Sequence, residues 1–281
     1  MLRLNAVKKH YPGFDLDCSI QVHKNQVTGL IGKNGAGKST AFKIILGLTQ
    51  YDSGSVELLG KPAGKLLPKD RERIGTVLAE TGFSEYLTIQ DLIPVLRSMY
   101  AKFDCDSFQK KCRAFDLPMN KQIHTFSTGM KRKLQVLTAI THEAELLILD
   151  EPTSGLDVIA RDELLDLFRE YMEQDGRAIL ISSHISADLE KFCDDIYMIH
   201  DGSMILHEET DLLLDRYALL KMSESQYEAL DKSYILRHKK EPYGISCLTS
   251  NKQFYLQNHP QIAAEKGSID ELITMMVRGE A

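Results

Sequence analysis

Residues 32–39 read Gly32-Lys33-Asn34-Gly35-Ala36-Gly37-Lys38-Ser39, and the apolar stretch Val27 to Ile31 stands directly before them. This pattern predicts a strand, a glycine-rich loop and a helix over Thr40 to Leu46. Glycines adopt backbone torsions closed to other residues, so the N–H groups of such a loop point inward and, with the helix N-terminus, bind a polyphosphate. We therefore expect residues 32–40 to bind ATP, with Lys38 on the β and γ phosphates and Ser39 as a ligand of Mg²⁺.

The composition is that of a globular chain. Its 281 residues are 43% hydrophobic, and no apolar run approaches the roughly 20 residues that cross a bilayer. The first residues lack the apolar core of a signal peptide, and five scattered cysteines fit a reducing compartment. A net charge of −6 gives no support for an extended nucleic-acid surface, and the basic cluster 131–133 is interpreted as a solvated helix face. We expect a cytoplasmic protein without a nucleic-acid partner.

The first part of the chain predicts a β layer followed by helices. Apolar and polar residues alternate over 2–7 and 14–22, which is typical of half-buried antiparallel strands. Segments 54–59 and 74–78 read as further strands. A helical insert over about 84–141 is predicted from apolar residues at helical spacing in 88–100, 107–115 and 129–141.

After the insert, strands and helices alternate, which predicts a parallel sheet covered on both faces. The predicted strands are 145–149, 178–182 and 196–199, and the predicted helices are 159–174 and 187–193. After a turn at Asp201-Gly202, the sequence pattern changes to a mixed segment. We place a domain boundary near Asp215, which divides the chain into a main domain, 1–214, and a small α+β extension, 215–281, with a helix over 268–277.

Two acidic residues, Asp150 and Glu151, follow the apolar run Leu146 to Leu149. They are expected at the carboxyl end of a core strand, where ligands of open α/β sheets bind. Asp150 is placed to hold Mg²⁺, and Glu151 to orient and deprotonate the water that attacks the γ phosphate. An acidic pair after a strand is commonly a solvated loop, but here it accompanies a complete phosphate-binding loop.

Four motifs in a fixed order resemble the nucleotide-binding subunit of ATP-binding cassette (ABC) transporters, over about residues 1–210. They are the phosphate-binding loop, Ser127-Thr128-Gly129-Met130, Leu149-Asp150-Glu151-Pro152-Thr153-Ser154-Gly155-Leu156-Asp157, and Ser183-His184. The resemblance implies the P-loop NTPase cassette fold: an α/β fold with a parallel core sheet, an N-terminal antiparallel β layer and a helical insert.

The resemblance also implies a head-to-tail pair of cassettes. In such a pair, the ATP held by Lys38 of one copy is covered by Ser127 and Gly129 of the other. A helix N-terminus at Ser127 suits this role, because its free N–H groups and dipole favour anions. Asp157 then corresponds to a residue that crosses the dimer interface, and His184 to the histidine that contacts the γ phosphate.

Tyr11 matches the aromatic residue that stacks on adenine in the family. Two departures from the family pattern stand out. The signature has Thr128 and Met130 in place of its usual second glycine and glutamine, a variant similar to those of bacterial cassettes that serve exporters of peptides and antibiotics. The family's coupling glutamine is replaced as well: its position holds Ala79, with Glu80 next to it, and Glu80 is expected to contact the γ phosphate and Mg²⁺.

These observations predict an ATPase subunit that powers transport, in the export direction, through a separate transmembrane permease subunit. A second cassette, identical or different, completes the pair, and the chain is expected to be peripheral on the inner face of the cell membrane. The alternative is a soluble cassette ATPase that acts on DNA or ribosomes. Such relatives usually have two cassettes or a long coiled coil, and neither is present. A purely regulatory nucleotide-binding protein is disfavoured, because Glu151 and His184 are both intact.

Overall fold

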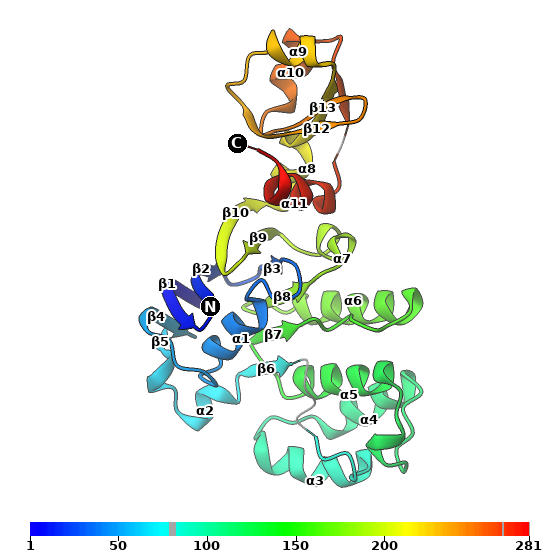
Figure 1. Ribbon diagram of the computed structural model, residues 1–281. Coiled ribbons are helices and arrows are strands. Elements are labelled where there is room, and N and C mark those ends of the chain that lie inside the picture. The colour runs from blue at the N-terminus through cyan, green and yellow to red at the C-terminus, as the bar shows by residue number, and fades with distance from the viewer. Residues whose placement is uncertain (79–82, 266, 281) are drawn as a thin grey trace.

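The computed structural model describes residues 1–78, 83–265 and 267–280, and its strands form two sheets (Figure 1). Within the described residues, the larger sheet has ten strands in the order β5-β4-β1-β2-β10-β9-β3-β8-β7-β6. The smaller sheet has four, in the order β12-β13-β11-β14. No helix in these three segments is both long and apolar enough to cross a membrane.

One side of the larger sheet is antiparallel, as the alternating sequence predicts. It is built from β1 (Leu2–Tyr11), β2 (Phe14–Val22), β4 (Ser53–Leu58) and the short β5 (Lys61–Pro62). β10 (Ser203–Glu209) joins the two sides, because it pairs with β2 in parallel and with β9 antiparallel. β1 pairs with β2 through a tight hairpin in which Tyr11 is opposite Phe14. This hairpin brings aromatic side chains to the end of the sheet that carries the glycine-rich loop.

The other side of the sheet is parallel and buried on both faces. It contains β3 (Val27–Ile31), β6 (Ile74–Val77), β7 (Leu146–Asp150), β8 (Ala178–Ser183) and β9 (Asp195–His200). Successive residues of these strands point to opposite faces, so Leu146 and Ile148 join one core cluster while Leu147 and Leu149 join another. The near-continuous apolar runs in the sequence are a consequence of this double coverage.

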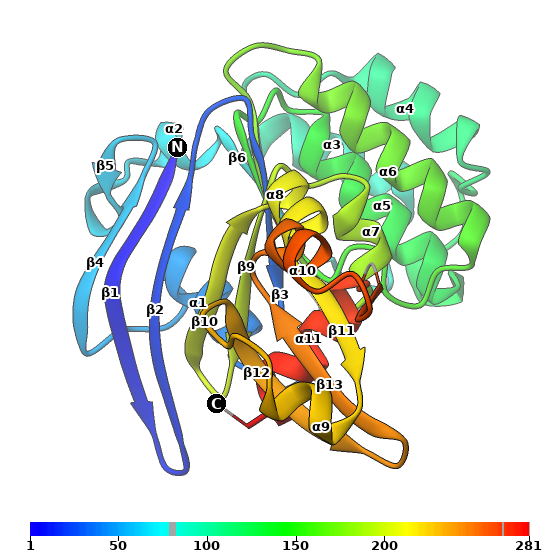
Figure 2. The same cartoon turned by 90° about the horizontal axis from the view of Figure 1, so that it is seen from above.

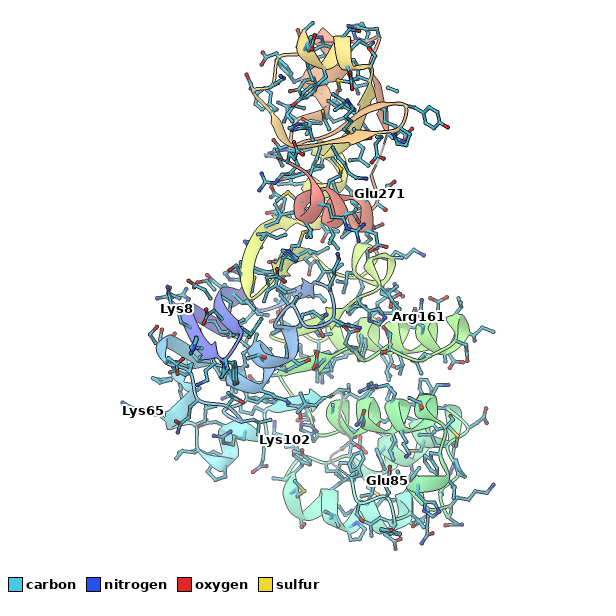
Figure 3. The ribbon with its side chains drawn as sticks, viewed as in Figure 1. Lys8, Lys65, Glu85, Lys102, Arg161 and Glu271 are labelled. Carbon is cyan, nitrogen blue, oxygen red and sulfur yellow. The ribbon has the colours of Figure 1, made fainter. Side chains whose placement is uncertain are left out.

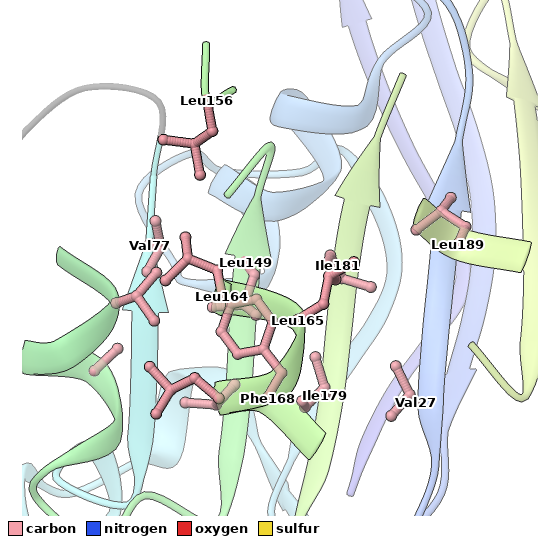
Figure 4. Close-up of a cluster of buried hydrophobic side chains, with 14 of the residues drawn as sticks. Val27, Val77, Leu149, Leu156, Leu164, Leu165, Phe168, Ile179, Ile181 and Leu189 are labelled. Atoms are coloured by element: carbon pink, nitrogen blue, oxygen red, sulfur yellow. The ribbon is translucent and has the colours of Figure 1, made fainter. Parts of the chain in front are cut away.

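Helices α1 (Lys38–Ile45) and α6 (Val158–Met172) cover the two faces of the parallel strands. Phe42 of α1 belongs to one core cluster, and Leu164 and Phe168 of α6 belong to the other. Figure 4 shows the second cluster, in which α6 side chains meet Leu149 of β7 and Ile179 of β8. The two helices therefore hold the strand ends that carry the candidate site.

A helical insert lies at the β6 edge of the sheet, as predicted. It contains α3 (Ile89–Met99), α4 (Cys105–Ala114), the short turn Ile123–Thr125 and α5 (Thr128–Ile140). A polar side chain accepts a hydrogen bond from a free N–H at the start of each helix: Thr88 for α3, Asp104 for α4 and Ser127 for α5. Short turns at Ala63–Lys65 and Pro68–Arg71 (α2) lead from β5 to β6.

The chain after β9 passes through β10 and α8 (Thr210–Arg216) into the smaller sheet (Figures 1 and 2). That sheet contains β11 (Ala218–Met222), β12 (Ile235–Glu241), β13 (Gly244–Thr249) and β14 (Ala263–Glu265). Side chains of α9 (Glu224–Glu228) and α10 (Lys252–Asn258) pack with one face, and α11 (Ile269–Arg278) packs against the other.

Helix α11 joins the extension to the rest of the molecule. Its residues Leu272 and Met275 belong to the same core cluster as Leu189 of α7 (Ser186–Glu190). The backbone N–H of Ile269 also donates a hydrogen bond to Glu190 Oε1 at 2.8 Å. The extension therefore shares a hydrophobic core with the ten-stranded sheet and has a smaller cluster of its own on its far face.

Removal of a leucine from this shared core should lower the free energy of unfolding. Leu164 is fully buried between α6 and the parallel strands, so Leu164→Ala removes apolar contacts and leaves a cavity. We expect a loss of about 2–5 kcal/mol, measured by urea unfolding followed by circular dichroism. Leu48→Ala is the matched control, because Leu48 is 63% exposed, and a similar loss in both variants would contradict the assigned core.

Candidate active site

The glycine-rich loop connects β3 to α1, as predicted from the sequence. Gly35 and Gly37 have φ values of 83° and 112°, which side-chain-bearing residues rarely adopt. Gly32 approaches β9 so closely that a Cβ atom there would lie 2.4 Å from the carbonyl oxygen of Ile199. No side chain caps α1, because Gly37 occupies the N-cap position. The first N–H groups of α1 therefore remain open to an anionic ligand.

Lys38 is the first residue of α1, and its ammonium points back into the loop. Nζ donates to the carbonyl oxygens of Gly32 at 2.6 Å and Lys33 at 3.3 Å, and the residue is only 5% exposed. Oε1 of Glu151 lies 3.3 Å from Nζ, without the geometry of a hydrogen bond, so this buried oxygen has no hydrogen-bond partner among the described residues. The Lys38 ammonium, which contacts two carbonyl oxygens of the loop, is placed to bind phosphate oxygens.

A cavity of about 360 Å³ lies over this loop. It is lined by Phe14, Lys33, Asn34, Gly35, Gly37, Lys38, Ser39, Thr40 and Glu151. Eight of the nine are residues that the sequence pattern selected, and Phe14 is the addition. Tyr11 is not among the lining residues, and its ring centroid lies 6.4 Å from that of Phe14. Phe14 can be selected only when it is known that the hairpin places it opposite Tyr11, and the sequence alone does not show this pairing.

Asp150 is the last residue of β7 and Glu151 follows it, and a hydroxyl group of the neighbouring β8 connects the two residues. Ser182 Oγ donates to Asp150 Oδ1 at 2.6 Å and accepts a hydrogen bond from the N–H of Glu151 at 3.0 Å. Glu151 has a φ of 52°, a strained value for a residue with a side chain. Ser182 therefore holds both the carboxylate of Asp150 and the backbone of Glu151, a role that the sequence analysis did not assign.

His184 contacts the other oxygen of the Glu151 carboxylate. Its Nδ1 lies 2.5 Å from Oε2, and its backbone N–H donates to the same atom at 3.2 Å. The carboxylate of Glu151 thus stands between the Lys38 ammonium and the His184 ring. The structure brings Lys38 together with two residues, Glu151 and His184, that lie more than 100 positions later in the sequence.

The donors fit a magnesium ion that also uses phosphate and water oxygens. Ser39 lies on the cavity wall, and the carboxylate of Asp150 lies at the same edge of the sheet, at the end of β7, with β8 between β7 and β3. No cluster of three acidic, histidine or cysteine ligands occurs in the described part of the chain. Mg²⁺ is commonly held by one or two protein oxygens with substrate phosphates and water, so this sparse donor set is suitable. Ala79 and Glu80, the alternatives for the coupling position, lie outside the described residues.

Arg132 is a buried cation near the acidic pair, so the interpretation of 131–133 as a solvated face was wrong for this residue. It is 8% exposed, and Nη1 donates to the carbonyl oxygen of Leu78 at 2.9 Å and to Gln135 at 3.0 Å. Burial lowers the pKa of Arg132, while the charges of Asp150 and Glu151 act in the opposite direction. Lys131 and Lys133 reach carboxylates of Glu85 and Glu163 at the surface, as a solvated face predicts.

Three other predicted residues lie outside the cavity. Ser127 is the N-cap of α5, and its Oγ accepts from the N–H of Met130 at 3.2 Å. A Cβ on Gly129 would lie 3.1 Å from Leu156, so the start of α5 contacts the loop that follows Glu151. Asp157 caps α6 by accepting from the N–H of Ala160 at 2.9 Å.

The loop after Glu151 is also tied to α7. Thr153 Oγ1 donates to Asp188 Oδ2 at 2.9 Å, and Arg161 of α6 lies 3.7 Å from the same oxygen. Figure 3 shows Arg161 on the side of α6 that faces toward α7. Since α7 begins two residues after His184, these contacts join the loop after Glu151 to the segment that follows His184.

Comparison with known proteins agrees with this site. The ABC transporter family model matches residues 16–154. The lantibiotic transport ATP-binding protein SrtF of Streptococcus pyogenes is 33% identical over 214 residues, 75% of this chain and 92% of SrtF. A solved ATP-binding subunit of an ABC transporter is 27% identical with a TM-score of 0.68, over 76% of this chain and 92% of that one.

A second solved structure shows the same fold at 20% identity and a TM-score of 0.66, over 75% of this chain and 99% of that one. It is a dimeric ATP-binding cassette in a post-hydrolysis state, bound to ADP and phosphate. The fold, the phosphate-binding loop and the relatives lead to one conclusion. The chain belongs to the ABC transporter family and is an ATP-binding, ATP-hydrolysing subunit of such a transporter.

Proposed function

We propose that the chain hydrolyses ATP through Glu151 and thereby powers export through a separate membrane subunit. The observation that carries this proposal is the position of the Glu151 carboxylate, 3.3 Å from Lys38 Nζ and 2.5 Å from His184 Nδ1. One oxygen of the carboxylate faces the loop that would hold the phosphates. The other is oriented by the ring and the backbone of His184.

Each residue of the site has a defined task in this proposal. Lys38 exchanges the carbonyl oxygens of Gly32 and Lys33 for the β and γ phosphates. Glu151 then accepts a proton from the attacking water, and His184 orients the carboxylate and contacts the γ phosphate. Bound Mg²⁺, held by Ser39 and Asp150 together with phosphate oxygens, supplies positive charge.

We further propose that two cassettes pair head to tail, so that Ser127 and Gly129 of one copy complete the site of the other. Both residues lie outside the cavity of their own chain. Beside the Asp157 cap, Val158 and Ile159 are adjacent apolar side chains that are 67% and 74% exposed, and pairing with a second copy would remove them from water. A related fold has been solved as a dimer, which is consistent with such pairing.

Export is favoured by two observations, the signature variant with Thr128 and Met130 and the relative named for lantibiotic transport. We propose that residues 1–214 act as the cassette and residues 215–281 as an extension. The chain would act in the cytoplasm, on the inner face of the cell membrane, with a transmembrane permease as partner. No nucleic-acid partner is proposed.

Glu151→Gln should separate ATP binding from hydrolysis. The amide preserves the shape of the side chain but cannot accept the proton, so hydrolysis should fall by about 10²-fold or more. ATP affinity, measured by equilibrium dialysis with Mg-ATP, should stay within about threefold, a change that costs under 1 kcal/mol. Glu173→Gln, at an exposed position, is the matched control for both measurements. Loss of ATP binding in Glu151→Gln would remove Glu151 from the role of base.

Mixing two inactive chains tests the head-to-tail site. Lys38→Ala disables the loop, and Ser127→Arg blocks the covering helix with a bulky cation. Each variant alone should lose hydrolysis. In a mixed pair, one site contains both changes and the other contains neither. Half of the pairs in an equal mixture are mixed, and each of these has one intact site of two, so the mixture should recover about a quarter of the normal rate.

The control for this mixture is a chain that carries both changes, mixed with either single variant, which should stay inactive. Circular dichroism melting checks that Ser127→Arg is folded. We expect that it is, because loss of the N-cap lowers the free energy of unfolding by only about 1 kcal/mol. An active Ser127→Arg chain, or a mixture without recovery, would contradict the trans site.

The membrane partner can be sought with the Glu151→Gln chain as bait. A tagged form, purified from detergent-solubilised cells with Mg-ATP, should retain a polytopic membrane protein, since the nucleotide-bound state persists. Lys38→Ala serves as the matched bait that cannot hold ATP. Recovery of ribosomes or DNA in place of a membrane protein would favour the soluble cassette ATPases instead.

A further inference from the structure

A second cavity lies in the extension, remote from the phosphate-binding loop in sequence and in fold. It has a volume of about 720 Å³ and lies between α11 and the sheet strands β11, β12 and β13. This volume is in the range of about 300–1,000 Å³ that is typical of small-molecule sites. None of its lining residues belongs to the candidate active site.

Apolar groups form much of the wall of this cavity. Leu219 of β11 and Met275 of α11 are buried in the wall, 6% and 4% exposed. Tyr243, in the turn between β12 and β13, is fully exposed at the rim, at 101% of its reference area. An aromatic ring that nothing covers, beside an apolar wall, offers a face to a ligand.

The charges around the cavity are predominantly negative. Lys221 lies 2.6 Å from Glu265, and Lys239 lies 2.6 Å from Glu241, so both lysines of the wall are already paired. Asp270, at the start of α11, also lines the cavity and has no ion pair with any residue of the described segments.

Glu271 adds a further negative charge beside Asp270 (Figure 3). Its carboxylate accepts a hydrogen bond from the N–H of Ser268, the N-cap of α11, at 2.9 Å and so completes a capping box. The charge of Glu271 also acts on Lys221, whose pKa is raised mainly by its hydrogen bond with Glu265. The carboxylates of this region therefore outnumber the ammonium groups, and a cation would be favoured over an anion.

We propose that this cavity, bounded by α11 and the β12–β13 hairpin, binds an amphipathic organic cation, a small molecule with an apolar body and an ammonium group. Leu219 and Met275 contact the apolar body. Asp270 and the face of the Tyr243 ring contact the ammonium group. An anionic amphiphile of the same size is repelled, because the lysines that could receive it are already held by Glu265 and Glu241.

The ligand would contact a helix that also touches the cassette. The opposite side of α11 packs against α7, and the N–H of Ile269 donates to Glu190 of that helix. Asp270 follows Ile269 directly, so the proposed contact is one residue away from the link to α7. A molecule at this site is therefore positioned to affect the helix that follows His184.

The absence of tryptophan from the chain provides a clean reporter. Tyr243→Trp places a single tryptophan at the rim and keeps an aromatic face there. Its fluorescence is titrated with n-decylamine, n-decanol and n-decanoate below their micelle-forming concentrations, in the full-length chain at pH 7. We expect saturable binding of the amine, about tenfold tighter than that of the carboxylate, with the alcohol between them.

Two further changes in this reporter chain locate the contact. Asp270→Asn should weaken binding of the amine by about threefold to fivefold and leave the alcohol unchanged. Thr274→Phe, at an exposed lining position of α11 one turn after Asp270, should obstruct the cavity wall and weaken binding of all three compounds. Glu228→Gln, a charge removal elsewhere on the extension, should have no effect, and circular dichroism melting confirms folding of each chain.

Three outcomes would overturn the proposal. Equal affinities for the three compounds would indicate unspecific apolar binding, and tighter binding of decanoate would reverse the assigned charge preference. Unchanged binding in a folded Thr274→Phe chain would place the compounds elsewhere. None of these measurements depends on ATP hydrolysis, so the proposed function and this proposal can fail separately.

Discussion

The site depends on one constraint, the burial of a cation and a carboxylate at the carboxyl edge of parallel strands that are covered on both faces. Lys38 is almost completely buried, and Glu151 faces it at 3.3 Å. Buried charges are stable only when they are paired and hydrogen-bonded, so Lys38 also uses the carbonyl oxygens of its own loop. A polyphosphate would replace those carbonyl contacts with stronger ones, because its oxygens carry negative charge.

At the same edge of the sheet, hydrogen bonds connect residues that come from separate strands. Ser182 connects Asp150 to the backbone of Glu151, and His184 orients the Glu151 carboxylate. Arg132 reaches this region from the helical insert and donates to Leu78, at the end of β6. The insert is therefore attached to the sheet by a buried charge as well as by apolar packing.

The extension is coupled to the cassette by a helix with two packed sides. One side of α11 faces the smaller sheet and the cavity, and the other faces α7. Because Ile269 and Leu272 are buried in the shared core, the extension cannot move freely of the sheet without exposing apolar area. This arrangement joins the extension to the region of His184 through α7.

The sequence by itself determined the ATP-binding cassette fold, the phosphate-binding loop and the alternation of strands and helices. These features depend on local torsions and on hydrophobic period, which neighbouring residues set. The roles of Lys38, Glu151 and His184 stay predictions, although the structure brings the three side chains together. Only the tertiary structure decided that Phe14 lines the cavity, that Arg132 is buried and that α11 closes a second cavity. Each of these depends on contacts between segments far apart in the chain, which no local pattern records.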